Sequence, residues 1–355
     1  MRTVPLRVFR RIGYRRPHQA PGPGAAAPAH RGFALPTYET GGYDDPYAPE
    51  LLRRIALLGA NWVQLNPTWY QPAPGTATIR PTPMTASDAG VARMVALAHA
   101  QGLNALLKPH VDLDDGTDRA TIRPADPDAW FTAYTRFITH YARIAARCGA
   151  DAFAIGTELA GTDGDLTRWT AVADRVRVIY GGPLVYAANY DAYEGVAFWH
   201  TVDLVGVDAY WPLSERPTRD VRRLLRAWTP VRDRLAAFAA RTGRPVLFTE
   251  AGYASERGGV TAPYSRTVST VPDAAEQAVG YEALLRAFSG LPWWAGVHWW
   301  VWEQLPTPPA RERALDYSAD GKEAASVVAQ WWNAPPPSPP SRPPNPPNSP
   351  NGARS

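Results

Sequence analysis

Cysteine is nearly absent from this chain of 355 residues, in which Cys148 stands alone. A single thiol forms neither an internal disulfide nor a zinc site built from several cysteines. Lysine is almost as scarce, since Lys108 and Lys322 are the only two among 37 basic residues. The sequence therefore excludes a fold held by disulfides, and we interpret the shortage of lysine as a compositional bias toward arginine.

Long apolar runs are also missing. No stretch approaches the roughly 20 apolar residues that cross a bilayer, and the amino terminus lacks the apolar core of a signal peptide. We therefore expect no membrane partner and, for the sequence as written, a cytoplasmic location. An export signal upstream of this start would change the expected location to secreted or periplasmic.

Acidic residues are missing from both ends of the chain. Residues 1–38 hold seven arginines and no acid, and residues 335–355 hold two arginines and no acid. Because the whole chain has a formal net charge of +4, the stretch between these ends carries −5. A negatively charged body argues against a phosphate-binding surface, so we expect no nucleic-acid partner.

Proline is concentrated near the carboxyl terminus, where ten of the 37 prolines fall between Pro335 and Pro350. Such a run adopts extended backbone and packs no core. We expect residues 335–355 to form a disordered Pro-rich tail and residues 1–31 to form a disordered basic arm. Residues 32–334 are then expected to form one folded domain.

Short apolar runs alternate with amphipathic stretches through that domain, and the runs are too apolar to leave one face in water. Eight runs predict strands, at 32–38, 61–66, 103–109, 151–158, 183–188, 203–210, 245–250 and 295–302. Apolar spacings of three and four predict helices between them, among them 49–59, 86–102, 126–149 and 273–288. The pattern favours an α/β fold with a closed (β/α)₈ arrangement, a TIM barrel, over an open doubly wound sheet. No glycine-rich phosphate loop follows the first strand.

Two glutamates end apolar strands, at the edge where such barrels place their chemistry. The fourth predicted strand ends at Glu158 and the seventh at Glu250. Partial desolvation and a facing carboxylate both favour the neutral form, so one of the pair should hold a proton near neutral pH. Retaining cleavage of a glycosidic bond needs one carboxylate as nucleophile and one as acid and then base. The alternative for either glutamate is an ion pair with arginine or a helix cap.

The other strand ends carry amide, imidazole, carboxyl and aromatic side chains. Groups that bond hydroxyls, interleaved with flat aromatic faces, favour a carbohydrate site over a phosphate or nicotinamide pocket. For each tryptophan the alternative is packing in the core. The candidate substrate-binding residues are Asn66, Trp69, His110, Asn189, Asp208, Tyr210, Trp211 and Trp300.

His110 opens the stretch HVDLDD, in which histidine and carboxylates are possible cation ligands. No second histidine cluster lies at another strand end, and no G-x-S-x-G elbow marks a serine hydrolase. We therefore expect no metal and no organic cofactor. We interpret His110 as a hydrogen-bonding residue for the substrate or for a catalytic glutamate.

Seven segments carry a family resemblance, and in chain order they are GANWVQLNPTWYQ, LLKPHVD, FAIGTELAG, LVYAANYD, DLVGVDAYWPL, LFTEAGY and HWWVW. Over residues 32–332 the chain resembles glycoside hydrolase family 113. That family consists of retaining (β/α)₈ enzymes and includes endo-β-1,4-mannanases. The resemblance implies that Glu158 is the acid/base and Glu250 the nucleophile. It also implies that Tyr210 hydrogen-bonds the nucleophile and that Trp300 stacks on the sugar beside the scissile bond.

One position departs from the wider superfamily, because Thr157 stands where an asparagine usually precedes the acid/base and bonds the sugar 2-hydroxyl. Either Asn189 or His110 is then expected to take over that contact. We predict a monomeric retaining endo-glycosidase that cuts β-1,4-mannan, glucomannan or manno-oligosaccharides. The alternatives are another β-glycan such as xylan or a glucan, a sugar-binding barrel that does not hydrolyse, and a scaffold whose arm or tail recruits a partner.

Overall fold

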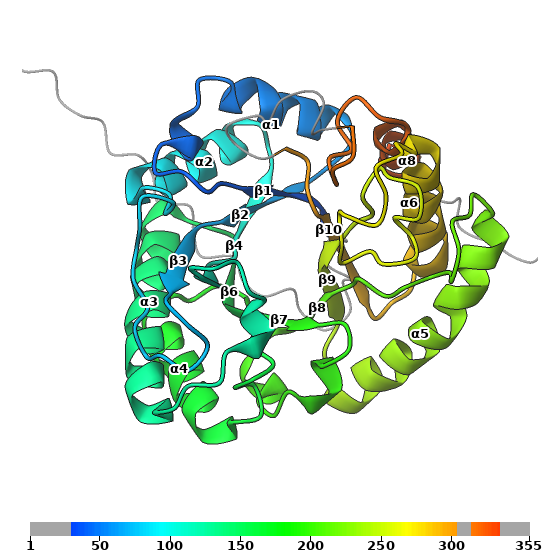
Figure 1. Ribbon diagram of the computed structural model, residues 1–355. Coiled ribbons are helices and arrows are strands. Elements are labelled where there is room, and N and C mark those ends of the chain that lie inside the picture. Colours follow the sequence, from blue (N-terminus) through cyan, green and yellow to red (C-terminus); the bar gives the residue numbers. More distant parts are fainter. Residues whose placement is uncertain (1–29, 304–313, 334–355) are drawn as a thin grey trace, which may run out of the picture.

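The computed structural model describes residues 30–303 and 314–333, which form a closed barrel of eight parallel strands surrounded by helices (Figure 1). Around the barrel the strands follow the order β1, β2, β4, β6, β7, β8, β9 and β10, and β10 pairs with β1. Neighbours in the barrel are thus neighbours in the chain. The predicted (β/α)₈ barrel is confirmed.

The barrel strands lie where the apolar runs predict them. They are His30–Pro36 (β1), Trp62–Asn66 (β2), Asn104–Leu107 (β4), Ala152–Thr157 (β6), Leu184–Asn189 (β7), Leu204–Asp208 (β8), Val246–Ala251 (β9) and Trp294–Trp299 (β10). Every residue of β2, β6 and β9 is buried. Helices cover the outer face of such strands and side chains fill the interior, so both faces are packed and these strands are mostly apolar.

The helices form the outer ring in Figure 1. They are Ala48–Leu57 (α1), Asp88–Ala100 (α2), Pro127–Cys148 (α3), Leu166–Ile179 (α4), Val221–Thr242 (α5), Ala274–Phe288 (α6) and Glu323–Trp332 (α8). Local chemistry sets their ends: in α3, Asp126 accepts a hydrogen bond from the Ala129 amide at 3.0 Å, and Gly149 ends the helix with φ +75°. Of the helices that the structure describes, none is long and apolar enough to cross a membrane.

A second, smaller sheet extends the barrel beyond β2 and β4. Thr68–Gln71 (β3) and His110–Leu113 (β5) pair in parallel, each directly after a barrel strand. The sequence did not predict these two strands. A short helical turn, Arg119–Thr121 (η2), follows β5.

The expected boundary of the folded domain at residue 32 is two residues late. The His30 ring stacks on Trp62 with centroids 3.9 Å apart, and Arg31 Nη1 donates to the Trp332 carbonyl at 2.8 Å. Both residues therefore belong to β1 and close the barrel. The rest of the predicted basic arm and the predicted Pro-rich tail lie outside the described residues.

Candidate active site

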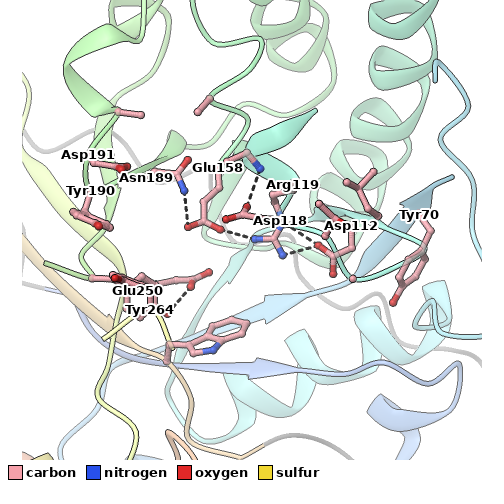
Figure 2. A pocket seen from close by; sticks show the side chains of 18 of the residues that line it. Tyr70, Asp112, Asp118, Arg119, Glu158, Asn189, Tyr190, Asp191, Glu250 and Tyr264 are labelled. Atoms are coloured by element: carbon pink, nitrogen blue, oxygen red, sulfur yellow. Dashed lines mark hydrogen bonds and ion pairs between the residues drawn. The ribbon is translucent and has the colours of Figure 1, made fainter. Parts of the chain in front are cut away.

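A cavity of about 820 Å³ lies at the carboxyl ends of the strands, within the size range of ligand sites. Loops and strand ends from β1 to β10 contribute to its wall. The lining includes Tyr38, Tyr70, Asp112, Arg119, Glu158, Asn189, Tyr190, Tyr210, Glu250, Tyr264, Trp300 and Tyr317. The wall thus combines aromatic faces with two predicted catalytic glutamates, and Figure 2 shows it from close by.

Glu250 lies within β9, and only 4% of it is exposed. The Lys108 ammonium lies 2.5 Å from its Oε1, and the Tyr210 hydroxyl donates to its Oε2 at 2.7 Å. Both carboxylate oxygens are therefore fixed in place. Charge-assisted hydrogen bonds of this kind are short and strongly directional.

Lys108 is itself fully buried in the barrel, between two carboxylates. Its Nζ lies 3.1 Å from both oxygens of Asp208, and Asp208 also accepts from the Thr249 hydroxyl at 2.6 Å. Burial alone would lower the pKa of Lys108, but attraction by Asp208 and Glu250 outweighs it and raises that pKa. Burial and the Glu250 charge raise the pKa of Asp208. One ammonium thus serves two carboxylates.

Glu158 follows directly after β6 and has a left-handed backbone with φ +52°. Among the described residues it is the only one other than glycine with positive φ. Its amide donates to the Ala187 carbonyl on β7 at 2.7 Å. A side chain in this backbone region is strained, and such strain is typical of functional sites held in place by their surroundings.

Two donors, one at the end of β7 and one in η2, hold the Glu158 carboxylate. Asn189 donates from Nδ2 to Oε1 at 3.1 Å, and Arg119 donates from Nη1 to Oε2 at 2.6 Å. Arg119 in turn donates to Asp112 Oδ1 from Nε at 2.9 Å and from Nη2 at 2.5 Å. Figure 2 shows Arg119 between Asp112 and Glu158, with Asn189 on the other side of the glutamate.

The surroundings raise the pKa of Glu158 to about 8. Burial is the largest cause, and the charges of Asp208 and Glu250 add to it, while Arg119 and Lys108 oppose it. These surroundings therefore favour the protonated form of Glu158. The cavity thus holds two glutamates in unlike surroundings, and their catalytic roles stay a prediction.

Three predicted substrate-binding residues line the cavity, namely Asn189, Tyr210 and Trp300. Trp300 lies in the stretch after β10, and its ring is nearly parallel to that of His110, with centroids 6.1 Å apart. The peptide bond between Trp300 and Val301 is cis. These three side chains therefore form part of the cavity wall.

Asn66, His110 and Asp208 lie one layer below, buried and not among the described residues that line the cavity. Asn66 Nδ2 lies 3.0 Å from His110 Nε2, and burial lowers the pKa of His110 well below its ordinary range. His110 Nε2 is 3.8 Å from Glu250 Oε1, beyond hydrogen-bonding distance. Their positions do not support direct substrate contact. Asn66, His110 and Asp208 instead form part of the buried floor of the site.

Trp69 and Trp211 also lie outside the described lining of the cavity. Trp69 contacts Phe137, His140 and Tyr141 of α3. Trp211 packs against Trp228 and Phe248. Both fit the packing alternative, because placement near a strand end does not determine which way a side chain points.

Sequence reasoning missed the two cations of the site. Lys108 was visible as a lone basic residue in the apolar run LNALLKP, which is a signal for a buried functional group. Arg119 gave no such signal, because it lies in a polar loop among other charged residues. Asp112 was read as a polar strand-end residue of a sugar site and as a possible cation ligand, and in the structure it holds Arg119. Among residues 30–303 and 314–333 no three His, Cys, Asp or Glu side chains gather as a metal site.

Comparisons with known proteins identify the family of this chain. The model of Glycoside Hydrolase Family 113 matches residues 33–322. A solved β-mannanase of family 113 from Alicyclobacillus acidocaldarius, in complex with ManMIm, is 31% identical, with a TM-score of 0.78 over 87% of this chain and 99% of that chain. No curated protein matches this chain.

Two more distant solved structures share the fold. A family 113 β-1,4-mannanase is 23% identical, with a TM-score of 0.78 over 87% of this chain and 100% of that chain. A family 5 protein from Streptomyces cattleya, solved with GlcNAc, is 17% identical, with a TM-score of 0.58 over 87% of this chain and 82% of that chain. The family match spans both glutamates and nearly all of the barrel, so this chain is a glycoside hydrolase and belongs to family 113.

Proposed function

We propose that this chain hydrolyses β-1,4-mannan, glucomannan or manno-oligosaccharides within the glycan chain and with retention at the anomeric carbon. The observation that carries the mechanism is the unequal environment of the two glutamates. Glu250 accepts from Lys108 and Tyr210, whereas burial raises the pKa of Glu158 to about 8. The mannan substrate rests on the likeness to the β-mannanase from Alicyclobacillus acidocaldarius.

The reaction proceeds in two displacements. Glu250 attacks the anomeric carbon while Glu158 gives its proton to the leaving glycosidic oxygen, so the bond to the leaving sugar breaks as the ester bond forms. Water then attacks the same carbon and passes a proton to Glu158. The ester bond breaks, Glu250 returns as a carboxylate, and the configuration of the substrate is retained.

Asn189 is the residue we assign to the sugar 2-hydroxyl. Its Nδ2 holds Glu158, while its Oδ1 has no hydrogen-bond partner among the described residues. Asn189 lines the cavity, whereas His110, the other candidate, lies below it. Because Oδ1 is buried, the second hydrogen of Nδ2 is the group we assign to the sugar, while the first positions the acid/base.

The decisive experiment replaces Glu250 with alanine. We expect turnover of an aryl β-mannobioside to fall by at least about 10⁴-fold, because the covalent step is lost. Azide should restore turnover and yield a glycosyl azide of inverted configuration, measured by NMR. Glu282→Ala, on α6 outside the barrel, is the matched control and should keep activity. Wild-type activity in Glu250→Ala would refute the proposal.

The competing substrates are other β-glycans cut by the same two glutamates. Mannan, glucomannan, xylan and soluble β-glucan are incubated with the protein and the products are separated by chromatography. We expect oligosaccharides from the first two only. Faster release from xylan or β-glucan would transfer the assignment to that glycan, and binding without release would favour a barrel that does not hydrolyse.

We also propose that the barrel works as a monomer and without a nucleic-acid partner. Removing residues 1–29 and 334–355 takes away eight arginines and leaves His30 and Arg31 in β1. We expect kcat/KM on mannan and a monomeric elution volume to be unchanged by this removal. A loss of activity would favour the alternative in which the ends recruit a partner.

A further inference from the structure

Arg119 makes the closest contact with the proposed acid/base, and the mechanism above does not yet use it. It lies in η2, outside the barrel strands, and its side chain is 16% exposed. Nη1 donates to Glu158, while Nε and Nη2 both donate to Asp112 Oδ1. Three directed hydrogen bonds fix the guanidinium in one orientation.

This contact opposes the first half of the reaction. Glu158 has to hold a proton before the leaving oxygen takes it, yet an arginine 2.6 Å away stabilises the carboxylate. In the second half the requirement is reversed, because Glu158 has to be ionised when water attacks. An arginine in this position favours that second state.

We propose that Arg119 is a positioning residue that keeps Glu158 ionised in the glycosyl-enzyme intermediate, so that it acts as base toward water, and that Asp112 holds Arg119 in place for this purpose. The inference rests on the proposed function and extends it to the step at which this side chain matters.

The charges around Glu158 explain why such a residue is needed. Asp208 from β8 and Glu250 from β9 favour the protonated form, and Lys108 opposes them from below. When Glu250 becomes an ester it loses its charge, but the burial of Glu158 and the Asp208 charge persist. Without Arg119, Glu158 would take a proton from solvent before water attacks.

The test uses Arg119→Met in the full chain, with a manno-oligosaccharide for kcat/KM and, for kcat and the burst, an aryl β-mannobioside that has a good leaving group. We expect the basic limb of kcat/KM to move up by about one pH unit or more, because the first displacement needs protonated Glu158. The acid limb of kcat should also move up, because the second displacement needs ionised Glu158. The intermediate should accumulate and give a burst of one leaving group per enzyme.

Azide separates a lost base from a general defect, because azide attacks the intermediate without needing one. We expect azide to raise kcat of Arg119→Met at least about tenfold at pH 6 and to leave the wild type nearly unchanged. Arg119→Lys keeps a cation, so both limbs of its pH profiles should lie close to those of the wild type. Arg123→Met is the matched control, since Arg123 lines the same cavity but donates to the carbonyls of Ala120 and Ile122, and it should leave both limbs in place.

Unmoved limbs in Arg119→Met, or the absence of both the burst and the azide effect, would overturn the inference. If that variant does not fold, the double variant Arg119→Met with Asp112→Asn removes both charges and is judged by the same three readouts. Failure here is distinct from failure of the proposed function. Activity in Glu250→Ala would refute the latter, whatever Arg119 does.

Discussion

The ends of β6 and β9 look alike in the sequence and differ in the structure. Both read as an apolar run followed by threonine and glutamate, Thr157 with Glu158 and Thr249 with Glu250. Glu250 stays in its strand, with a buried lysine and a tyrosine as partners. Glu158 lies just after its strand and is itself left-handed, and its partners come from β7 and a loop.

The difference shows that the role of each glutamate depends on its neighbours from other strands. The fully buried Lys108 ammonium contacts Glu250 from inside the barrel floor, where water does not reach the cation. Burial and the charges of Asp208 and Glu250 raise the pKa of Glu158, whereas Arg119, on a loop, lowers it. The raising effects are larger, and the pKa is about 8. Identical side chains are thereby given opposite starting states.

Removing the buried Lys108 should have the largest effect of the changes around Glu250. In Lys108→Met, Asp208 and Glu250 remain buried without their shared cation. We expect kcat to fall by about 10² to 10³ and the free energy of unfolding to fall by about 3 to 5 kcal/mol. Lys322→Met, which breaks a partly exposed ion pair with Asp316, is the control and should lose less of both. Urea unfolding and steady-state kinetics give the two numbers, and equal losses would contradict the role of Lys108.

Tyr210→Phe removes a single donor from the same glutamate and should have the next largest effect. A hydrogen bond to a charged group contributes about 1.5 to 3 kcal/mol, so we expect kcat/KM to fall about 10- to 100-fold with little change in KM. Tyr70→Phe is the control. Tyr70 lines the same cavity, but its hydroxyl has no hydrogen-bond partner among the described residues. A similar loss in both variants would show that the Tyr210 contact is not special.

The pH dependence of kcat/KM and of stability tests the environment of Glu158. Because the pKa of this acid is raised to about 8, kcat/KM should fall as pH rises past that value. The folded protein also holds this proton more tightly than the unfolded chain, whose ordinary glutamate pKa is 4.5. Glu158 therefore contributes stability at low pH that is lost as pH rises from about 4.5 to about 8. Thermal melts should show a flatter decline over that range in Glu158→Gln, and parallel curves would contradict the raised pKa.

The two threonines give the smallest effects and a direct contrast. Thr249 donates to Asp208 at 2.6 Å, so Thr249→Val should cost about 1 to 3 kcal/mol of unfolding free energy and lower kcat several-fold. Thr157 is 2% exposed and its hydroxyl has no partner among the described residues, so Thr157→Val should stay within about twofold in kcat/KM. A large loss on mannan in Thr157→Val would show that this hydroxyl, and not Asn189, reaches the sugar.

Sequence reasoning reached the barrel and both glutamates because each rests on a local pattern. The eight apolar runs can be recognised directly in the sequence, and a glutamate that ends such a run has a predictable place at the barrel mouth. Asn189, Tyr210 and Trp300 followed from the same rule and line the cavity. The family resemblance added roles to the glutamates but placed no cation beside them.

What the sequence did not show depends on side-chain direction and on distant contacts. Trp69 lies on β3, a strand that the sequence did not predict, and its ring faces α3. Asp208 ends its strand as expected but lies under the cavity with Lys108. The pair between Arg119 and Glu158 joins residues 39 positions apart through a loop, and no periodicity encodes such a contact.

The left-handed backbone at Glu158 means that the working enzyme is not the most stable form of this chain. Glycine adopts that conformation without strain, so Glu158→Gly should relieve it and also remove a buried ionisable group. We expect this inactive variant to melt at a higher temperature than the wild type at pH 9. Selection for thermal stability alone would then favour loss of the acid/base. Any attempt to stabilise this barrel therefore has to screen for activity as well.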